Sequence, residues 1–161
     1  MLPRTYEGQH CSIAGTLEVV GDRWTLLVIR EAFRGTSRFD DFLARIGLAR
    51  TVLTDRLNRL IDEQILERVR YQQRPDRYEY RLTQKGLDLF PVIVSLMAWG
   101  DRHVMGGQPP LVFHHRGCGG AVTDRRVCAS CGQELGPRDV EPRPGPGAIQ
   151  GGSSARLLPK S

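Results

Sequence analysis

The feature that most constrains the fold is a pair of amphipathic segments separated by very few residues. Residues 40–46, DDFLARI, have the apolar spacing of a short helix, and Gly47 is a residue type that commonly ends helices. Only Leu48 separates this glycine from a second periodic segment, residues 49–63. Two helices joined by so short a glycine-containing link are typical of a helix-turn-helix unit.

The second segment, ARTVLTDRLNRLIDE, has two chemically different sides. Its apolar side chains form one stripe at helical spacing: Leu53, Leu57, Leu60 and Ile61. Its far side carries short hydrogen-bonding groups and one arginine: Arg50, Thr51, Thr54, Asp55 and Asn58. A major groove admits a helix, and its base edges offer partners for such side chains. An ordinary solvated face would have a similar composition, so this segment alone leaves both interpretations open.

The next stretch favours the nucleic-acid interpretation. Residues 65–83, ILERVRYQQRPDRYEYRLT, have extended character on both sides of a Pro75-Asp76 turn signal. Arg74 and Arg77 flank this turn. A hairpin with arginines at its tip, directly after a helix-turn-helix, predicts a winged helix whose tip reaches the DNA backbone or minor groove.

Helices are predicted on either side of this unit. Residues 11–20 and 23–33 have helical apolar spacing, and Thr83 is a suitable cap for a long helix over residues 84–103. The long helix is apolar over more of its surface than one small domain covers, which favours a symmetric partner. The alternative is that it packs wholly within its own chain. Pro91 is expected to kink it or to open one backbone hydrogen bond.

The charge balance fits a polyanionic partner. The chain has 23 Lys and Arg against 18 Asp and Glu, a net charge of +5. No apolar run is long enough to cross a membrane and no secretory pattern begins the sequence, so a cytoplasmic protein without membrane contact is expected. The sequence holds no glycine-rich phosphate loop, nucleophile elbow or paired-carboxylate signature, so no enzyme is expected.

Residues 11 to about 103 resemble the HxlR family of bacterial winged-helix regulators. The resemblance rests on CSIAGTLEVVGDRWTLLVIREAFRG, RFDDFLARIG, LTDRLNRLIDEQILERVRYQQRPDRYEYRLTQKG and WGDRH, which follow one another in order. It implies a mainly α (α+β) fold, a winged helix-turn-helix with a long dimerisation helix. It also implies a homodimer on double-stranded DNA, with a palindromic operator whose half-sites lie about one helical turn apart.

The resemblance further implies which residues act. The DNA contacts would be Arg38, Arg50, Thr51, Thr54, Asp55, Asn58, Arg74 and Arg77. Cys11 matches the position at the start of the first helix where some family members sense electrophiles or oxidants. A helix N-terminus favours the reactive thiolate, so Cys11 is a candidate sensor. The alternative is that Cys11 is a small hydrophobic residue at a dimer interface.

A metal-ligand pattern follows the winged helix. Residues 114–132, HHRGCGGAVTDRRVCASCG, hold three of the four cysteines. His115 and Cys118 are separated by two residues, and so are Cys128 and Cys131. At that spacing a tight turn presents two ligands to one tetrahedral ion. The pattern predicts a structural zinc ion bound by these four residues in a zinc-ribbon-like appendage.

Three alternatives stay open for this segment. His114 or a water molecule could replace His115 as the first ligand. The two C-terminal cysteines could form a redox pair, or all the cysteines could stay reduced without metal. Gly119 and Gly132 favour the metal site, because each follows a ligand pair at a turn position that tolerates positive φ.

The predicted organisation has four parts: a flexible arm (1–10), a winged-helix DNA-binding and dimerisation domain (11–106), a zinc-ribbon-like module (111–136) and a disordered tail (137–161). The predicted function is a homodimeric repressor of its own or a neighbouring gene, released by a small molecule or an oxidant. The alternative is a protein–protein adaptor that uses the same two modules as scaffolds.

Overall fold

The computed structural model describes residues 6, 9, 11–140, 143 and 146. The chain divides into two compact units, residues 1–107 and 108–161. Most of the predicted arm (1–10) and most of the predicted tail (137–161) lie outside the described residues. Within the described part, no helix is long and apolar enough to cross a membrane.

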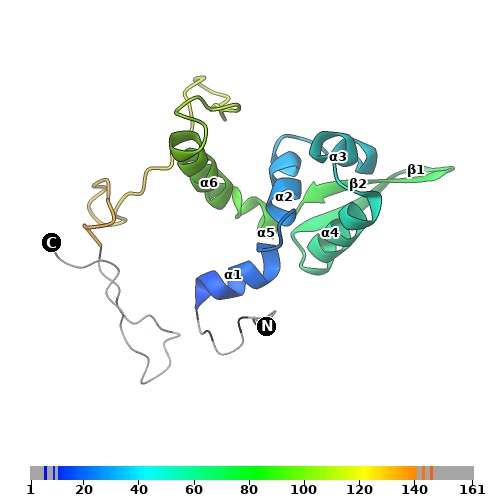
Figure 1. Cartoon of the computed structure of the whole chain (residues 1–161), viewed down its shortest axis with the longest axis horizontal. Coiled ribbons are helices and arrows are strands. Elements are labelled where there is room, and N and C mark those ends of the chain that lie inside the picture. Colours follow the sequence, from blue (N-terminus) through cyan, green and yellow to red (C-terminus); the bar gives the residue numbers. More distant parts are fainter. Residues whose placement is uncertain (1–5, 7–8, 10, 141–142, 144–145, 147–161) are drawn as a thin grey trace. The chain divides into compact units, whose positions relative to one another are not determined.

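The first unit has six helices and a two-stranded antiparallel sheet among its described residues (Figure 1). In chain order these are α1 (Ser12–Val20), α2 (Thr25–Phe33), α3 (Phe39–Ile46), α4 (Arg50–Asp62), β1 (Leu66–Gln73), β2 (Asp76–Leu82), α5 (Gln84–Leu87) and α6 (Phe90–His103). Helices α3 and α4 with the β1–β2 hairpin form the winged helix-turn-helix that the sequence predicts. The mainly α (α+β) fold class is therefore confirmed.

The turn between α3 and α4 follows from the residues that form it. Gly47 caps α3 in the left-handed conformation, with φ 74°, a region that residues with a Cβ rarely adopt. Ala49 is the N-cap of α4. Because only Leu48 lies between these two caps, α4 leaves α3 at a sharp turn, as a helix-turn-helix requires.

The core of the first unit lies under α4. Leu53, Leu57 and Leu60 are each 0% exposed, which confirms these three members of the predicted apolar stripe, whereas the fourth, Ile61, is only half-buried. Further fully buried side chains come from α2, α3, the residue before β1 and the first residue of β1: Val28, Ile29, Phe42, Ile65 and Leu66. Burial of the leucine side fixes the rotation of α4, so its other side must face outward.

The wing departs from a regular hairpin at one residue. The register pairs Arg70 with Tyr78 and then Gln72 with Arg77, so Tyr71 forms a β-bulge. The bulge interrupts the regular alternation of side chains between the two faces of β1.

The single long helix predicted over residues 84–103 is wrong. The segment is divided into α5 and α6, with Asp88 and Leu89 between them. Pro91 lies in the first turn of α6, where its missing N–H has no helical partner to lose, so it begins a helix rather than kinking one. The predicted cap is confirmed, since the Thr83 hydroxyl accepts a hydrogen bond from the Gly86 amide at 3.1 Å.

Candidate nucleic-acid interface

The outward face of α4 carries all five side chains predicted to contact DNA from this helix. Each of them is exposed: Arg50, Thr51, Thr54, Asp55 and Asn58. They lie opposite the leucines that are buried in the core of the first unit. We call this set the α4 polar face. It presents donors and acceptors along one side of a helix, which is the arrangement that major-groove recognition uses.

The N-terminal end of the α4 polar face is organised around Arg50. The Arg50 guanidinium donates a hydrogen bond to the Asp40 carboxylate at 2.9 Å and lies 5.1 Å from the centre of the Phe39 ring. A hollow of about 350 Å³ opens beside it, lined by Phe39, Arg50, Thr51, Thr54 and Asp55. The Arg50 side chain is 66% exposed, so solvent and ligands can still reach it.

The tip of the wing presents two more of the predicted arginines. Arg74 and Arg77 are both exposed. The Gln72 side-chain amide donates to the Arg74 carbonyl at 3.0 Å, and Arg70 lies 3.5 Å from the Asp76 carboxylate. These contacts hold the backbone of the tip and leave the side chains of Arg74 and Arg77 accessible.

Arg38 joins the wing to α3. It is the N-cap of α3, and its guanidinium lies 4.8 Å from the centre of the Tyr71 ring and 3.8 Å from the Glu79 carboxylate. Arg38 and Glu79 also form an isolated antiparallel bridge. The Arg38 side chain is still 56% exposed. Sequence reasoning selected Arg38 but missed Tyr71 and Glu79, because no local pattern links a bulged tyrosine to a residue on another element.

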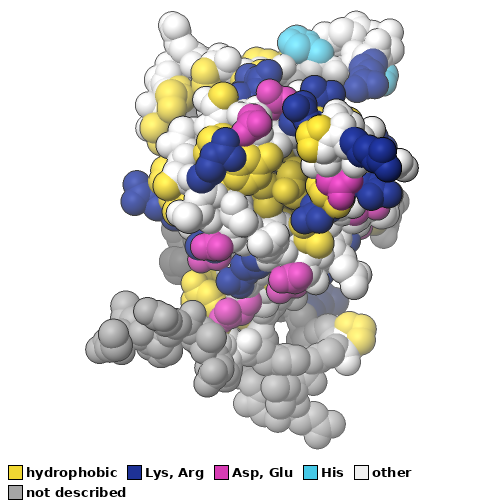
Figure 2. Space-filling view, turned by 90° about the vertical axis from the view of Figure 1, so that its right-hand side faces the viewer, with side chains coloured by type: hydrophobic (Ala, Val, Ile, Leu, Met, Phe, Trp, Pro, Cys, Tyr) yellow, Lys and Arg dark blue, Asp and Glu magenta, His cyan; other side chains and the backbone are white. Residues whose placement is uncertain are grey.

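Figure 2 shows the side of the protein from which the wing projects. Basic side chains, in dark blue, are spread over this face around an apolar centre, and acidic side chains lie among them. The charge on this face is therefore mixed, so shape and hydrogen bonding must contribute to recognition beside charge attraction.

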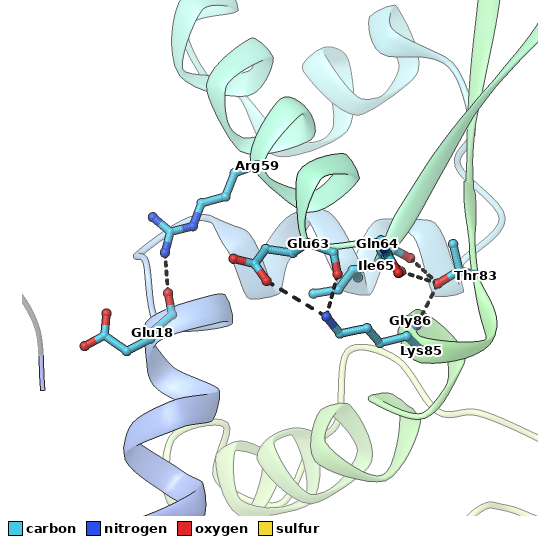
Figure 3. A network of polar contacts seen from close by, with 8 residues as sticks. All are labelled: Glu18, Arg59, Glu63, Gln64, Ile65, Thr83, Lys85 and Gly86. Atoms are coloured by element: carbon cyan, nitrogen blue, oxygen red, sulfur yellow. Dashed lines mark hydrogen bonds and ion pairs between the residues drawn. The ribbon is translucent and has the colours of Figure 1, made fainter. Parts of the chain in front are cut away.

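The C-terminal end of α4 is tied to α1 and α5 (Figure 3). The Arg59 guanidinium donates to the backbone carbonyl of Glu18 on α1. The Lys85 ammonium donates a hydrogen bond to the Glu63 carbonyl at 2.6 Å. The Thr83 hydroxyl donates a hydrogen bond to the Gln64 carbonyl, also at 2.6 Å. The position of α4 therefore depends on where α1 and α5 lie.

Helices α1 and α6 expose large apolar side chains. On α1, Ile13 is 70% exposed, and on α6 Leu96 is 50% and Trp99 is 58% exposed. Further exposed apolar side chains lie on or next to these helices: Leu17, Leu87, Val92, Val104 and Met105. So many exposed apolar side chains are unusual on a surface that is fully solvated.

Cys11 lies where the sequence placed it, at the start of the first helix. It is the N-cap of α1 and is exposed. The backbone amides of Ala14 and Ile13 in the first turn lower the pKa of its thiol, because they favour the thiolate. This exposure is that of a single chain, so the alternative interpretation of Cys11 as a small hydrophobic residue at a dimer interface stays open.

The second unit brings the predicted zinc ligands together in pairs. His115 Nδ1 lies 3.2 Å from Cys118 Sγ. The Cys131 backbone amide, the Ser130 amide and the Cys131 thiol hydrogen-bond the Cys128 sulfur and lower its pKa. Over the described residues, no group of three or more His, Cys, Asp or Glu side chains is placed to hold a metal ion. The two pairs are thus formed, but the four ligands do not converge.

The helix-turn-helix, the wing beside it and the outward α4 polar face define the class of protein: a winged helix-turn-helix transcriptional regulator that binds DNA. Residues 19–108 match the HxlR-like helix-turn-helix family, and the chain belongs to this family. The resemblance predicted from sequence is therefore confirmed. The adaptor alternative finds no support in these comparisons.

Individual relatives agree with the class. The chain is 44% identical over 147 residues to the HTH-type transcriptional regulator Rv3095 of Mycobacterium tuberculosis, covering 91% of this chain and 92% of that one. The crystal structure of PA1607, a candidate transcription factor, has a TM-score of 0.75 at 32% identity and covers 84% of this chain and 96% of that one. The redox regulator HypR in its reduced form has a TM-score of 0.55 at 29% identity and covers 61% of this chain and 100% of its own.

Proposed function

We propose that the protein is a homodimeric repressor that binds a palindromic operator near its own or a neighbouring gene. The observation that carries the proposal is the α4 polar face, which is held outward beside a wing whose tip exposes Arg74 and Arg77. A helix that enters the major groove and a wing that follows the flanking backbone would together contact one half-site.

The proposed contacts divide by chemistry. Arg50 is suited to a guanine, because a guanidinium can donate two hydrogen bonds to its N7 and O6 atoms. The remaining members of the α4 polar face contact neighbouring base edges or phosphates: Thr51, Thr54, Asp55 and Asn58. Arg38, Arg74 and Arg77 contact phosphates or the minor groove, which sets register and adds affinity for any sequence.

The dimer is proposed to form through α1 and α6. Exposure of their apolar side chains to water is unfavourable, among them Ile13, Leu96 and Trp99, and burial against a partner would remove it. A second copy supplies an equivalent surface, and two-fold symmetry makes that contact self-complementary. The two recognition helices must then lie about 34 Å apart to enter successive major grooves.

Repression would end when an effector changes this spacing. Cys11 is the proposed electrophile sensor, with its exposed thiol and lowered pKa, and HypR, to which the chain is similar, is a redox regulator. The thiolate sulfur adds to the electrophilic carbon of a quinone, and the ring takes up a proton from water. Cys11 caps α1, and α1 holds α4 through the Glu18 carbonyl and Arg59, so a displaced α1 would move the recognition helix.

A fluorescence-anisotropy titration on DNA from upstream of the protein's own gene tests the proposal, with a scrambled duplex as control. We expect tighter binding to the upstream DNA, and footprinting should protect two half-sites about 10–10.5 bp apart. Sedimentation should give a dimer. A folded dimer that binds neither DNA at low salt would refute the proposal.

The sensor role has its own test. Quinone treatment should release the wild-type protein from its operator and leave the Cys11→Ser variant bound. Equal release of both proteins would remove Cys11 from the mechanism and leave the operator-binding proposal intact.

A further inference from the structure

Two separate turns in the second unit have the same backbone. The His115 amide donates to the Gly120 carbonyl at 2.8 Å, and the Gly119 amide donates back to the His115 carbonyl at 2.8 Å. The same two hydrogen bonds recur at Cys128, each at 2.9 Å. The Cys128 amide donates to the Gln133 carbonyl, and the Gly132 amide donates to the Cys128 carbonyl. We call residues 114–121 the first knuckle and residues 127–134 the second knuckle.

The match extends beyond these hydrogen bonds. The first knuckle closes with a bridge between residues 114 and 121, and the second with a bridge between residues 127 and 134. Gly119 has φ 72° and Gly132 has φ 71°, both in the left-handed region that favours glycine. Two segments of different sequence therefore share one turn, and each turn carries a pair of side chains that bind soft metals.

The shared turn decides between the two histidines. His115 occupies the position of Cys128, the first ligand of the second knuckle. His114 occupies the position of Val127, and its Nδ1 lies 2.8 Å from the Gly119 carbonyl. Only His115 therefore has the placement of a ligand.

The His115–Cys118 pair of the first knuckle lies within hydrogen-bond distance, close to the separation that a shared ion requires. His115 Nδ1 and Cys118 Sγ are 3.2 Å apart, while two such ligands of a tetrahedral zinc ion lie about 3.6 Å apart. Gly117 makes room for the imidazole, because a Cβ at this position would lie 2.9 Å from His115 Cε1.

Residues 108–140 of the second unit have neither an apolar core nor a disulfide. Among residues 108–140, no side chain is buried, although the unit is compact. Cys118, Cys128 and Cys131 are all free thiols. A small module without an apolar core needs a cross-link to fold, and a metal ion is a common one.

We propose that the two knuckles bind one zinc ion, through His115 Nδ1 and the sulfurs of Cys118, Cys128 and Cys131. Binding converts any thiols to thiolates and releases their protons to solvent. Four protein ligands leave no open position for a reacting water, so the ion is structural. The two pairs stand apart in this structure, and metal binding draws the knuckles together, which couples binding to folding of the unit.

Metal analysis of the full chain, purified under reducing conditions without chelator or histidine tag, tests the proposal. We expect about one zinc per chain, released when a mercurial reagent blocks the thiols. Replacement by Co²⁺ should give the intense visible absorption of a tetrahedral thiolate site. Less than roughly 0.2 zinc per chain, before and after incubation of reduced protein with zinc chloride, would overturn the proposal. So would a Cys128–Cys131 disulfide found by mass spectrometry in protein kept under reductant.

Matched variants test the ligand assignment. His115→Gln and Cys118→Ser should lose most of the zinc, whereas His114→Gln and Cys11→Ser should keep it. Thermal unfolding of each variant should still show the cooperative transition of the first unit, which checks that the chain is folded. Loss of zinc from His114→Gln but not from His115→Gln would overturn the assignment. Because metal content is measured without DNA, this test is independent of operator binding.

Discussion

Replacing Arg50 by alanine should separate base recognition from general attraction to DNA. Arg50 lies at the N-terminal end of the α4 polar face, where it pairs with Asp40 at 2.9 Å. These two side chains are 66% and 80% exposed, and an exposed ion pair contributes about 0–1 kcal/mol. Arg50→Ala should therefore leave the free energy of unfolding within about 1 kcal/mol of the wild type.

The expected effect on DNA binding is much larger. One bidentate interaction between arginine and guanine contributes about 1–3 kcal/mol of discrimination. A dimer carries two copies of Arg50, so specific binding should weaken by about 2–6 kcal/mol, or roughly 30-fold to 10⁴-fold. Arg77→Ala should instead weaken binding to all sequences alike. Because each protomer of this variant would neutralise one phosphate fewer, the salt slope of the dimer should become shallower by about 1.8.

The assay is fluorescence anisotropy on operator and scrambled duplexes at several salt concentrations. Arg23→Ala is the matched control, since Arg23 is exposed on the turn before α2 and its replacement removes the same charge. The ratio of operator to scrambled affinity should fall for Arg50→Ala and stay unchanged for Arg77→Ala and Arg23→Ala. If Arg50→Ala weakens both duplexes by the same factor, Arg50 does not contact bases.

Three further outcomes are expected. Leu96→Glu should convert the dimer to monomer in sedimentation experiments, because it places a charge in the proposed α1–α6 interface; Ala44→Glu, on α3, should not. Leu57→Ala should lower the free energy of unfolding in urea by about 2–5 kcal/mol, because it removes a fully buried side chain, whereas Asn58→Ala on the exposed side should change it by less than about 0.5 kcal/mol. Because its pKa is lowered, Cys11 is a thiolate over a wider pH range in the folded chain. Its alkylation, followed by peptide mass spectrometry, should therefore reach half-maximal rate at lower pH than in guanidinium, and equal midpoints would contradict the lowered pKa.

Local patterns were enough to predict the helix-turn-helix. The leucine stripe of α4 and the glycine that ends α3 depend on helical periodicity and on the φ range of one residue, which are properties of short segments. The α4 polar face followed directly, because burial of one side of a helix exposes the other. The exposure of its five side chains is established by the structure, and their contacts with DNA stay predictions.

The features that the sequence predicted wrongly or missed all depend on contacts outside the local segment. A proline such as Pro91 is compatible both with a kink inside a long helix and with the first turn of a new helix. The packing of α6 decides between these two structures. The bulge at Tyr71 and its contact with Arg38 join residues far apart in the chain, so no spacing rule could supply them.

Local sequence patterns predicted the helix-turn-helix, the wing, the apolar side of α4 and the residue types of the ligand pairs. These follow from the geometry of the peptide chain over a few residues. Packing in three dimensions decided where α4 is anchored, which residues surround Arg38, and where the segment 84–103 divides into two helices. Those features depend on contacts between distant residues, whose free energy no local pattern encodes.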